Sequence, residues 1–220
     1  MKDIHDRLMR GQETLGLELT TEQQDKLLAY VTLLIKWSKA YNLTAIKREE
    51  DIIDRHLLDS LAIVPFLKGG RFIDVGTGAG LPGVPLAILR PDHKIDLLDS
   101  NGKKTRFLIQ VCSELGLDNI EVIASRAETY KPALGYDGVL SRAFANLLEM
   151  IENTHHLCSQ DGCFYAMKGL YPSAEIDDLD AGIHVTTVHQ LSIPGIDEAR
   201  HLVVATIDDT YRPKRQRRLV

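Results

Sequence analysis

The chain has 220 residues, of which 44% are hydrophobic and 26% charged, which fits one globular domain with an appended element. No run approaches the roughly 18 consecutive apolar residues of a membrane span, and the first residues lack the apolar core of a secretory signal, so we expect a cytoplasmic protein without a membrane partner. The three cysteines form no C-x-x-C pair, and His155-His156 has no further ligand at metal-binding spacing, so no metal site is expected.

Positive charge is concentrated at the end of a chain whose formal net charge is −5. That net charge argues weakly against broad, non-specific affinity for nucleic acid. The last nine residues nevertheless contain no acidic residue and five basic ones, which are Arg212, Lys214, Arg215, Arg217 and Arg218. We expect this basic tail, residues 211–220, to be either a solvated end of the chain or an arm that binds phosphate.

The first third of the chain has the pattern of helices. Thr21 and Gln24 match a capping box, which predicts the start of a helix. Apolar residues then recur at helical spacing, and a second apolar stripe ends at Pro65. The members of the second stripe are Ile53, Leu57, Leu61 and Val64. We therefore predict an N-terminal helical segment over residues 1–65.

Strands and helices alternate from residue 66 to residue 210. The predicted strands cover residues 72–75, 94–98, 120–123, 138–140, 163–167, 185–191 and 201–207. The predicted helices cover residues 82–89, 101–115 and 146–157, and Asn101 and Gly116 cap the second of them. Such alternation predicts an α/β doubly wound sheet with helices on both faces. A short turn at residues 193–195 predicts a hairpin, which makes the sheet mostly parallel with an antiparallel last strand.

A glycine-rich loop follows the first predicted strand. Gly76, Gly78 and Gly80 allow a tight turn and the close approach of a ligand to the backbone, at the edge where a doubly wound sheet binds ligands. Dinucleotide sites have the spacing G-x-G-x-x-G, whereas this loop has G-x-G-x-G preceded by Asp74. The variant resembles the first motif of Rossmann-like class I methyltransferases. Their cofactor, S-adenosyl-L-methionine, carries an amino acid and a ribose but no phosphate.

Acidic residues follow the next two strands at positions suited to that cofactor. Asp99 ends the second strand, where a carboxylate accepts hydrogen bonds from ribose hydroxyls. Asp96 competes for this role, but it lies inside the strand. Ala127 and Glu128 follow the third strand and are placed to meet the adenine. The segment 141–144 follows the fourth strand, where we expect the transferred methyl group to lie.

Two motifs that the sequence lacks after the fourth strand restrict which kind of atom can accept the methyl group. There is no Asn/Asp-Pro-Pro-aromatic run, which methylases of exocyclic amines carry at this point. Cys158 and Cys163 lie too far along the chain to serve as the nucleophile of a carbon-5 pyrimidine methylase. An acceptor with a free lone pair, such as guanine N7, needs neither device. Catalysis then consists mainly of holding N7 in line with the methyl group, without a general base.

Seven segments together resemble one family. They are KAYNLT at 39–44, RHLLDS at 55–60, FIDVGTGAGLPG at 72–83, LLDS at 97–100, SRAF at 141–144, MKG at 167–169 and RHLV at 200–203. In this combination the chain closely resembles the RsmG (GidB) family, bacterial methyltransferases that make 7-methylguanosine in the 530 loop of 16S ribosomal RNA. The resemblance implies methyl transfer from S-adenosyl-L-methionine to N7 of guanine 527. The partner is then 16S rRNA, the 30S subunit or an assembly intermediate of it.

The resemblance also implies roles for individual residues. Gly76 and Leu81 are expected to line the methionine and ribose part of the cofactor site, and Ala127 and Glu128 to contact the adenosine. Arg142 is expected close to the cofactor, at the catalytic centre.

Other residues keep two interpretations. His56 and Asp59 fall in a family-like motif, although a pair that packs helices together explains them equally well. Lys168 either meets RNA phosphate or caps the end of a strand. The basic tail extends beyond shorter members of the family, and its RNA-binding role is therefore a separate expectation.

Two other functions are compatible with the same cofactor motif. A small-molecule methyltransferase would keep the cofactor site and use the N-terminal helices as a lid over its substrate. A ribosome-binding module would retain the fold with a vestigial site. The intact loop from Asp74 to Gly80, together with Asp99 and Glu128, argues against such degeneration.

Overall fold

The structure is a computed structural model, and it describes residues 2–41, 43, 49–142, 144 and 146–213. Within these residues, seven strands form one sheet in the order β3-β2-β1-β4-β5-β7-β6. The strands are β1 (Arg71–Val75), β2 (Lys94–Asp99), β3 (Ile120–Ala124), β4 (Tyr136–Ser141), β5 (Cys158–Lys168), β6 (Ile183–Leu191) and β7 (Arg200–Ile207). Strands β1 to β5 are parallel, and β7 runs antiparallel to both β5 and β6. The predicted doubly wound sheet with an antiparallel last strand is confirmed.

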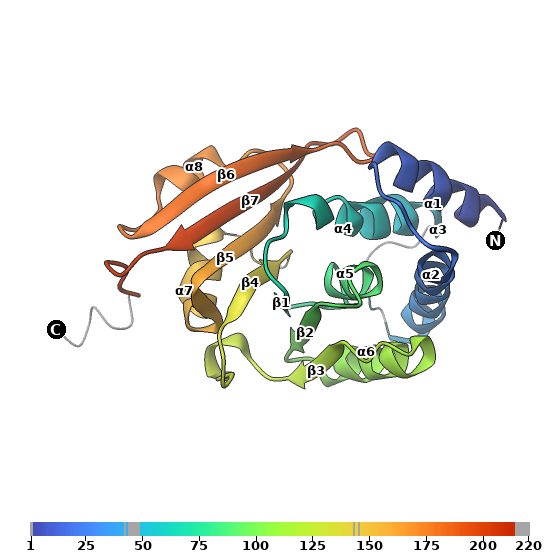
Figure 1. The fold of residues 1–220 in the computed structure, drawn as a ribbon, viewed down its shortest axis with the longest axis horizontal. Helices are drawn as coiled ribbons and strands as arrows, with labels where there is room; N and C mark the ends of the chain where they lie inside the picture. Colours follow the sequence, from blue (N-terminus) through green and yellow to red (C-terminus); the bar gives the residue numbers. More distant parts are fainter. Residues whose placement is uncertain (1, 42, 44–48, 143, 145, 214–220) are drawn as a thin grey trace.

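Helices precede the sheet and connect its strands (Figure 1). The N-terminal part contains α1 (Lys2–Thr14), α2 (Thr21–Tyr41), α3 (Glu49–Ile52), the π-helix η1 (Ile53–Leu58), α4 (Asp59–Leu61) and the 3-10 helix η2 (Val64–Phe66). The rest contains α5 (Gly83–Leu89), α6 (Gly102–Leu115), η3 (Ala127–Thr129), α7 (Leu147–Thr154), η4 (His155–Leu157) and α8 (Ser173–Asp177). Within the described residues, no helix is both long and apolar enough to cross a bilayer.

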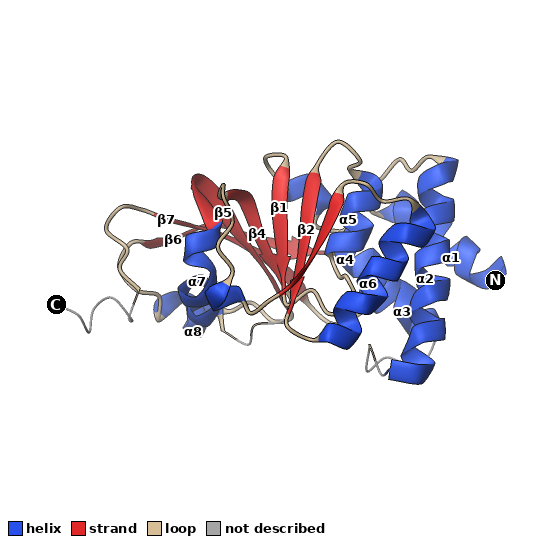
Figure 2. Cartoon of the chain, turned by 90° about the horizontal axis from the view of Figure 1, so that it is seen from below, coloured by secondary structure: helices blue, strands red, loops and turns tan. Residues whose placement is uncertain are grey.

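The sheet has a hydrophobic core on each face, because successive side chains of a strand point to opposite sides. Phe72 of β1 and Leu97 of β2 belong to one cluster, which also includes residues of α5 and α6. Their neighbours Ile73 and Leu98 belong to the other cluster, which includes residues of α7. Figure 2 shows α5 and α6 on one side of the strands and α7 on the other. Near-continuous apolar strands are what burial on both faces requires.

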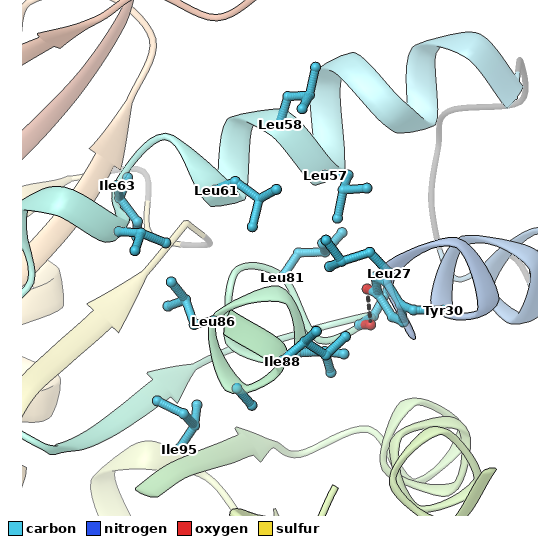
Figure 3. Close-up of a cluster of buried hydrophobic side chains, with 14 of the residues drawn as sticks. Leu27, Tyr30, Leu57, Leu58, Leu61, Ile63, Leu81, Leu86, Ile88 and Ile95 are labelled. Atoms are coloured by element: carbon cyan, nitrogen blue, oxygen red, sulfur yellow. Dashed lines mark hydrogen bonds between the residues drawn. The ribbon is translucent and has the colours of Figure 1, made fainter. Parts of the chain in front are cut away.

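The N-terminal helices pack onto the same core as α5 and α6. Leu27 and Tyr30 of α2 lie beside Leu81 and α5, and Leu57 of the π-helix points toward them (Figure 3). Leu58 points to the opposite side of that helix and belongs to the same core cluster. All four members of the predicted second stripe are buried, which confirms that it faces a core; they are Ile53, Leu57, Leu61 and Val64. The helical segment is therefore joined to the sheet by a shared hydrophobic interior.

The capping box of α2 lies one residue earlier than predicted. The backbone N–H of Thr20 donates to Gln23 Oε1 at 3.0 Å, and the N–H of Gln23 donates to Thr20 Oγ1 at 3.2 Å. The prediction of Thr21 and Gln24 was wrong because the two threonines fit the pattern equally well. Gln24 instead donates its side-chain amide to the carbonyl of Leu19 at 3.2 Å. Asn101 and Gly116 do cap α6 as predicted, Gly116 with a φ of 60°.

One boundary and one helix near the end of the sheet also differ from the prediction. Strand β5 begins at Cys158 instead of residue 163, since a register shift between Tyr136 and Gly138 of β4 lets Cys158 pair with Tyr136. Helix α8 had no predicted counterpart.

The strand order places β1 between β2 and β4, so the connections after β1 and β4 diverge at the carboxyl edge of the sheet. In doubly wound sheets, that divergence marks the ligand crevice.

Candidate active site

The loop after β1 depends on its glycines for its shape. Gly76, Gly78 and Gly80 have φ values of 67°, 63° and 92°, in the region that residues with a side chain rarely adopt. At Gly80 there is no room either, because a Cβ atom would lie 2.5 Å from Val84 Cγ2 and 2.8 Å from Leu108 Cδ2. At Gly78 the nearest atom would be 3.8 Å away. The loop is thus packed against α5 and α6 at Gly80 and open at Gly78.

Asp74 shapes this loop from beneath. Its Oδ2 accepts a hydrogen bond from Thr77 Oγ1 at 2.7 Å and another from the backbone N–H of Gly83 at 2.9 Å. The side chain is fully buried, and this burial raises the pKa of Asp74 to about 6. The acid that precedes the glycines therefore ties the loop to the start of α5, in a position away from solvent.

Helix α2 holds the loop from the other side. The hydroxyl of Tyr30 donates to the carbonyl of Ala79 at 2.8 Å, and both groups are buried. The bond is drawn as a dashed line in Figure 3, next to Leu81 of the same loop. Because a buried carbonyl without a partner costs about 1–3 kcal/mol, this contact favours one loop conformation. The N-terminal helices thus take part in building the site.

Asp99 ends β2 beside the open part of the loop. Its Oδ2 accepts from the N–H of Gly78 at 3.0 Å and lies 3.4 Å from Lys104 Nζ, while its Oδ1 accepts from the N–H of Asn101 at 2.8 Å. Asp96, the alternative acid, is directed elsewhere: its Oδ2 accepts from the hydroxyl of Tyr136 at 2.5 Å. Of the two carboxylates on β2, only that of Asp99 reaches the glycine loop.

Three adjoining hollows lie along the carboxyl edge of the sheet. The Asp99 hollow, of about 180 Å³, is lined by Val75, Gly76, Leu98, Asp99, Ser100, Ser125, Arg126, Ala127, Glu128 and Phe144. The Gly78 hollow, of about 250 Å³, is lined by Leu43, His56, Gly76, Thr77, Gly78, Ala79, Leu81 and Arg142. The Arg200 hollow, of about 310 Å³, is lined by Arg55, His56, Asp59, Arg142, Met167, Lys168, Gly169, Leu191, Arg200 and His201.

Neighbouring hollows share lining residues, so the three lie in a row. Gly76 lines both the Asp99 hollow and the Gly78 hollow. His56 and Arg142 line both the Gly78 hollow and the Arg200 hollow. A long ligand can therefore run from Glu128, past the glycine loop, and end against Arg142. The space on the far side of Arg142 is left for a second molecule.

Arg142 is held at this junction by groups from the π-helix η1 and the start of α4. Its Nη1 donates to Asp59 Oδ2 at 3.3 Å and to the carbonyl of Arg55 at 3.5 Å, and its Nη2 lies 3.3 Å from His56 Nδ1. Asp59 is only 4% exposed, and its Oδ1 lies 3.6 Å from Arg200 Nε. One buried carboxylate thus fixes two guanidinium groups. π-Helical turns occur frequently at functional sites.

Burial and the neighbouring Arg142 lower the pKa of His56 to about 4. The ring is therefore neutral at pH 7, and Nδ1 is free of a proton when it accepts from Arg142. For Asp59, burial raises the pKa while the charges of Arg142 and Arg200 lower it, with a net rise. The cluster combines two guanidinium groups with a neutral imidazole, so it positions charge without offering a base close to neutrality.

The depressed pKa of His56 leads to a prediction about pH and stability. An unfolded histidine titrates near pH 6.5, so the neutral ring contributes stability that is fully present above about 6.5 and is lost as the pH falls toward 4. The His56→Gln variant should therefore lose less of its melting temperature between pH 7.5 and pH 5 than the parent. His5→Gln, at an exposed position on α1, is the control. Equal losses in His56→Gln and the parent would contradict the assignment.

Of the residues predicted to bind RNA, Lys168 lies at the site and Arg212 does not. Lys168, the last residue of β5, lines the Arg200 hollow, and its Nζ contacts Glu175 Oε2 at 2.8 Å. Arg212 donates to the carbonyls of Asp209 and Tyr211, away from these hollows. The other four residues predicted for the basic tail lie outside the described residues; they are Lys214, Arg215, Arg217 and Arg218.

Several residues of the site had no predicted role. Arg200 and His201 stand in a segment that carries the family resemblance, but nothing in the sequence places them across from Arg142. Leu43 and Met167 also stand in such segments, but neither was assigned a role. Within the described residues, no group of His, Cys, Asp and Glu is arranged to hold a metal ion. The cysteines are half-buried and form no disulfide.

Solved methyltransferases share this fold. A SAM-dependent methyltransferase from Aquifex aeolicus matches 71% of this chain and 93% of its own, with a TM-score of 0.54 at 18% identity. A mutant of the 16S rRNA (adenine(1408)-N(1))-methyltransferase from Catenulisporales acidiphilia matches 70% of this chain and 92% of its own, with a TM-score of 0.53 at 18% identity. At such identities the likeness concerns the fold alone, which is that of the S-adenosylmethionine-dependent methyltransferases.

Sequence comparison then specifies the family. The model of the family described as GidB, rRNA small subunit methyltransferase G, matches residues 23–203. A ribosomal RNA small subunit methyltransferase G from Pseudomonas syringae pv. syringae is 51% identical over 197 residues, which cover 90% of this chain and 92% of the relative. One from Shewanella amazonensis is 49% identical over 200 residues, with 91% and 97% covered. The chain belongs to the rRNA small subunit methyltransferase G family.

Proposed function

We propose that this protein transfers the methyl group of S-adenosyl-L-methionine to RNA of the small ribosomal subunit, at N7 of guanine 527. The observation that carries the proposal is the row of three adjoining hollows, in a chain of this family. The row has room for a long cofactor on one side of Arg142 and for an acceptor on the other. When bound, the cofactor supplies a methyl group on a positively charged sulfur.

The residues along the row fit the parts of that cofactor in order. Gly76, Gly78, Gly80 and Leu81 would hold the methionine part, since the loop presents backbone without Cβ atoms at its open side. Asp99 would accept from the ribose hydroxyls. A carboxylate has about four acceptor positions, and the long 3.4 Å contact with Lys104 is the easiest to exchange. Ala127 and Glu128 would meet the adenine in the Asp99 hollow.

We propose Arg142 as the residue that positions the reacting groups. It lines both the cofactor path and the Arg200 hollow, where the guanine would enter. The positive charge of the cofactor would lie near a guanidinium group, and the buried carboxylate of Asp59, 3.3 Å from Arg142, offsets that repulsion. A guanine N7 lone pair attacks without loss of a proton, which suits a site whose histidine is neutral and whose other groups are already paired.

We propose a role for each of the three segments of the chain. Residues 1–65 would support the cofactor loop through Tyr30 and carry the π-helix to Arg142. Residues 66–210 would form the S-adenosylmethionine-binding domain. Lys168 in the Arg200 hollow and the basic residues from Arg212 onward would contact RNA phosphate.

Deletion of residues 212–218 tests the tail separately. We expect weaker RNA binding with a flatter dependence on salt, because each lost phosphate contact lowers the slope of log K against log salt by about 0.7–0.9. Affinity for S-adenosylmethionine should stay unchanged. The measurement is RNA binding at several salt concentrations. An unchanged slope would show that the tail is only a solvated end.

The proposal is tested by methyl transfer from labelled S-adenosylmethionine in an assay with three arms. We expect label in 16S rRNA, free or in 30S particles, and digestion should recover it as 7-methylguanosine. A pool of small metabolites is the second acceptor, and label there instead of in RNA would favour a small-molecule methyltransferase. Heat-denatured protein is the third arm and gives the background. If calorimetry detects no binding of S-adenosylmethionine, the chain is a binding module with a vestigial site.

A further inference from the structure

Two large apolar side chains stand exposed directly after the strand that borders the Arg200 hollow. Leu170 is 80% exposed and Tyr171 is 56% exposed. The only other large hydrophobic residues that stand out this far in the described part of the chain are scattered singly; they are Tyr41, Ile109 and Leu134. Single exposed apolar residues are ordinary, whereas an adjacent pair at the mouth of a site calls for a partner.

The short segment that carries this pair is braced at both ends. Before it, Gly169 accepts through its carbonyl from His201 Nδ1 at 2.7 Å. After it, Glu175 of α8 binds Lys168 Nζ at 2.8 Å and the backbone N–H of Leu147 at 2.7 Å. Tyr171 is therefore presented from a fixed frame, although its own side chain is mostly in solvent. A preformed surface loses little conformational entropy when a ligand binds.

Tyr171 lies beside the hollow that takes the acceptor. Its ring meets that of His201 edge to face, with centroids 5.7 Å apart, and His201 lines the Arg200 hollow. Arg200 and Arg55 line the same hollow, with side chains 22% and 38% exposed. Arg55 is paired with Glu198 and Arg200 lies near Asp59, so both guanidinium groups are held at the hollow. An aromatic face next to partly exposed guanidinium groups is a combination that binds single-stranded nucleic acid, by stacking on bases and contact with phosphates.

We infer that Tyr171, backed by His201, is a stacking platform for a nucleobase that neighbours the acceptor guanine in the RNA substrate. This inference rests on the proposed function, because it takes the Arg200 hollow as the acceptor position. The acceptor would occupy the hollow itself, and the next base along the strand would lie on the phenol ring at its rim. Leu170 would extend the apolar surface beneath that base. The cations at the rim would contact the connecting phosphates.

The test compares methyl transfer by the Tyr171 variants Ala, Phe and Trp on a short RNA that contains the acceptor. For Tyr171→Ala we expect KM for the RNA to rise by about 5- to 150-fold, the range found when a stacked base loses its aromatic partner. KM for S-adenosylmethionine should stay unchanged, and Phe and Trp should restore binding because they keep the aromatic face. Leu134→Ser is the matched control, since Leu134 is also exposed but precedes β4 at the opposite edge of the sheet.

A change in the RNA then identifies the contact. The nucleotide next to the acceptor, on the side where its base would stack on Tyr171, is replaced by an abasic one. This should raise KM for the RNA with the parent enzyme and should not raise it further with Tyr171→Ala. If transfer by the parent occurs and Tyr171→Ala leaves KM for RNA unchanged, the platform is refuted while the proposed function stands. If the loss appears only on 30S particles and not on free RNA, the partner is a ribosomal protein and the inference is wrong. If the parent transfers no methyl group to any RNA, the proposed function itself fails.

Discussion

Replacing Gly80 with alanine is expected to lower the free energy of unfolding by roughly 2–5 kcal/mol. One part of this loss is conformational: a φ of 92° is unfavourable for a residue with a Cβ atom, by about 1–2 kcal/mol. The other part is steric, because that Cβ atom would lie 2.5 Å from Val84 and 2.8 Å from Leu108, both fully buried. Overpacking of this kind costs about 1–3 kcal/mol.

Two matched glycines separate these contributions. Gly116→Ala also has a conformational cost at a φ of 60°, a smaller one than at Gly80, but nothing lies within 4 Å of its Cβ position. Gly78→Ala, at a φ of 63°, faces the open hollow, so it should reduce cofactor affinity more than stability. Thermal unfolding is the measurement, at about 2–4 °C of melting temperature per kcal/mol for a chain of this size. A Gly80 variant no less stable than the Gly116 variant would contradict the packing described for the loop.

Replacing Asp99 with alanine is expected to raise the dissociation constant of S-adenosylmethionine about 5- to 150-fold. This corresponds to about 1–3 kcal/mol for a charge-assisted hydrogen bond to the ribose. The structure adds a second reason, since Asp99 also orders the N–H groups of Gly78 and Asn101. Part of the loss therefore comes from a looser glycine loop, and Asp99→Asn, which retains one acceptor oxygen, should fall between alanine and the parent.

Asp96 provides the control for this experiment. It lies on the same strand and is also buried, but it binds Tyr136 and Arg71 instead of the loop. Asp96→Asn should therefore change stability without changing cofactor affinity, as measured by calorimetry. Equal losses of affinity at the two positions would mean that the distinction between the two acids of β2 is wrong.

The sequence predicts well whatever depends on residues close together in the chain. The glycines at 76, 78 and 80 mark a loop with positive φ, and the apolar runs beside them mark strands, because both signals are local. Asn101 and Gly116 cap α6 through contacts with their immediate neighbours. The capping box of α2 was misplaced by one residue for the same reason: Thr20 and Thr21 carry the same local signal, and only the backbone geometry distinguishes them.

The centre of the site depends on contacts that no local pattern contains. Arg142 and Asp59 are 83 positions apart, and Arg200 reaches the same carboxylate from β7. The sheet topology brings Arg142 and Arg200 together, and the packing of the N-terminal helices onto the core adds Asp59. For His56 and Asp59 both interpretations stay open: Asp59 is buried, and both side chains contact Arg142. The contact of Lys168 with Glu175 could not be predicted from the sequence either, because it depends on α8 folding back.

One measurement tests the central claim most directly: methyl transfer to 16S rRNA in which guanine 527 is replaced by 7-deazaguanine. This change removes the N7 lone pair and keeps the edge that forms Watson–Crick pairs. We predict that the parent protein binds the modified RNA nearly as well as the natural one and transfers no methyl group to it. Label incorporated at the same rate into both RNAs would show that the acceptor is another atom, and the account of a base-free transfer beside Arg142 would be wrong.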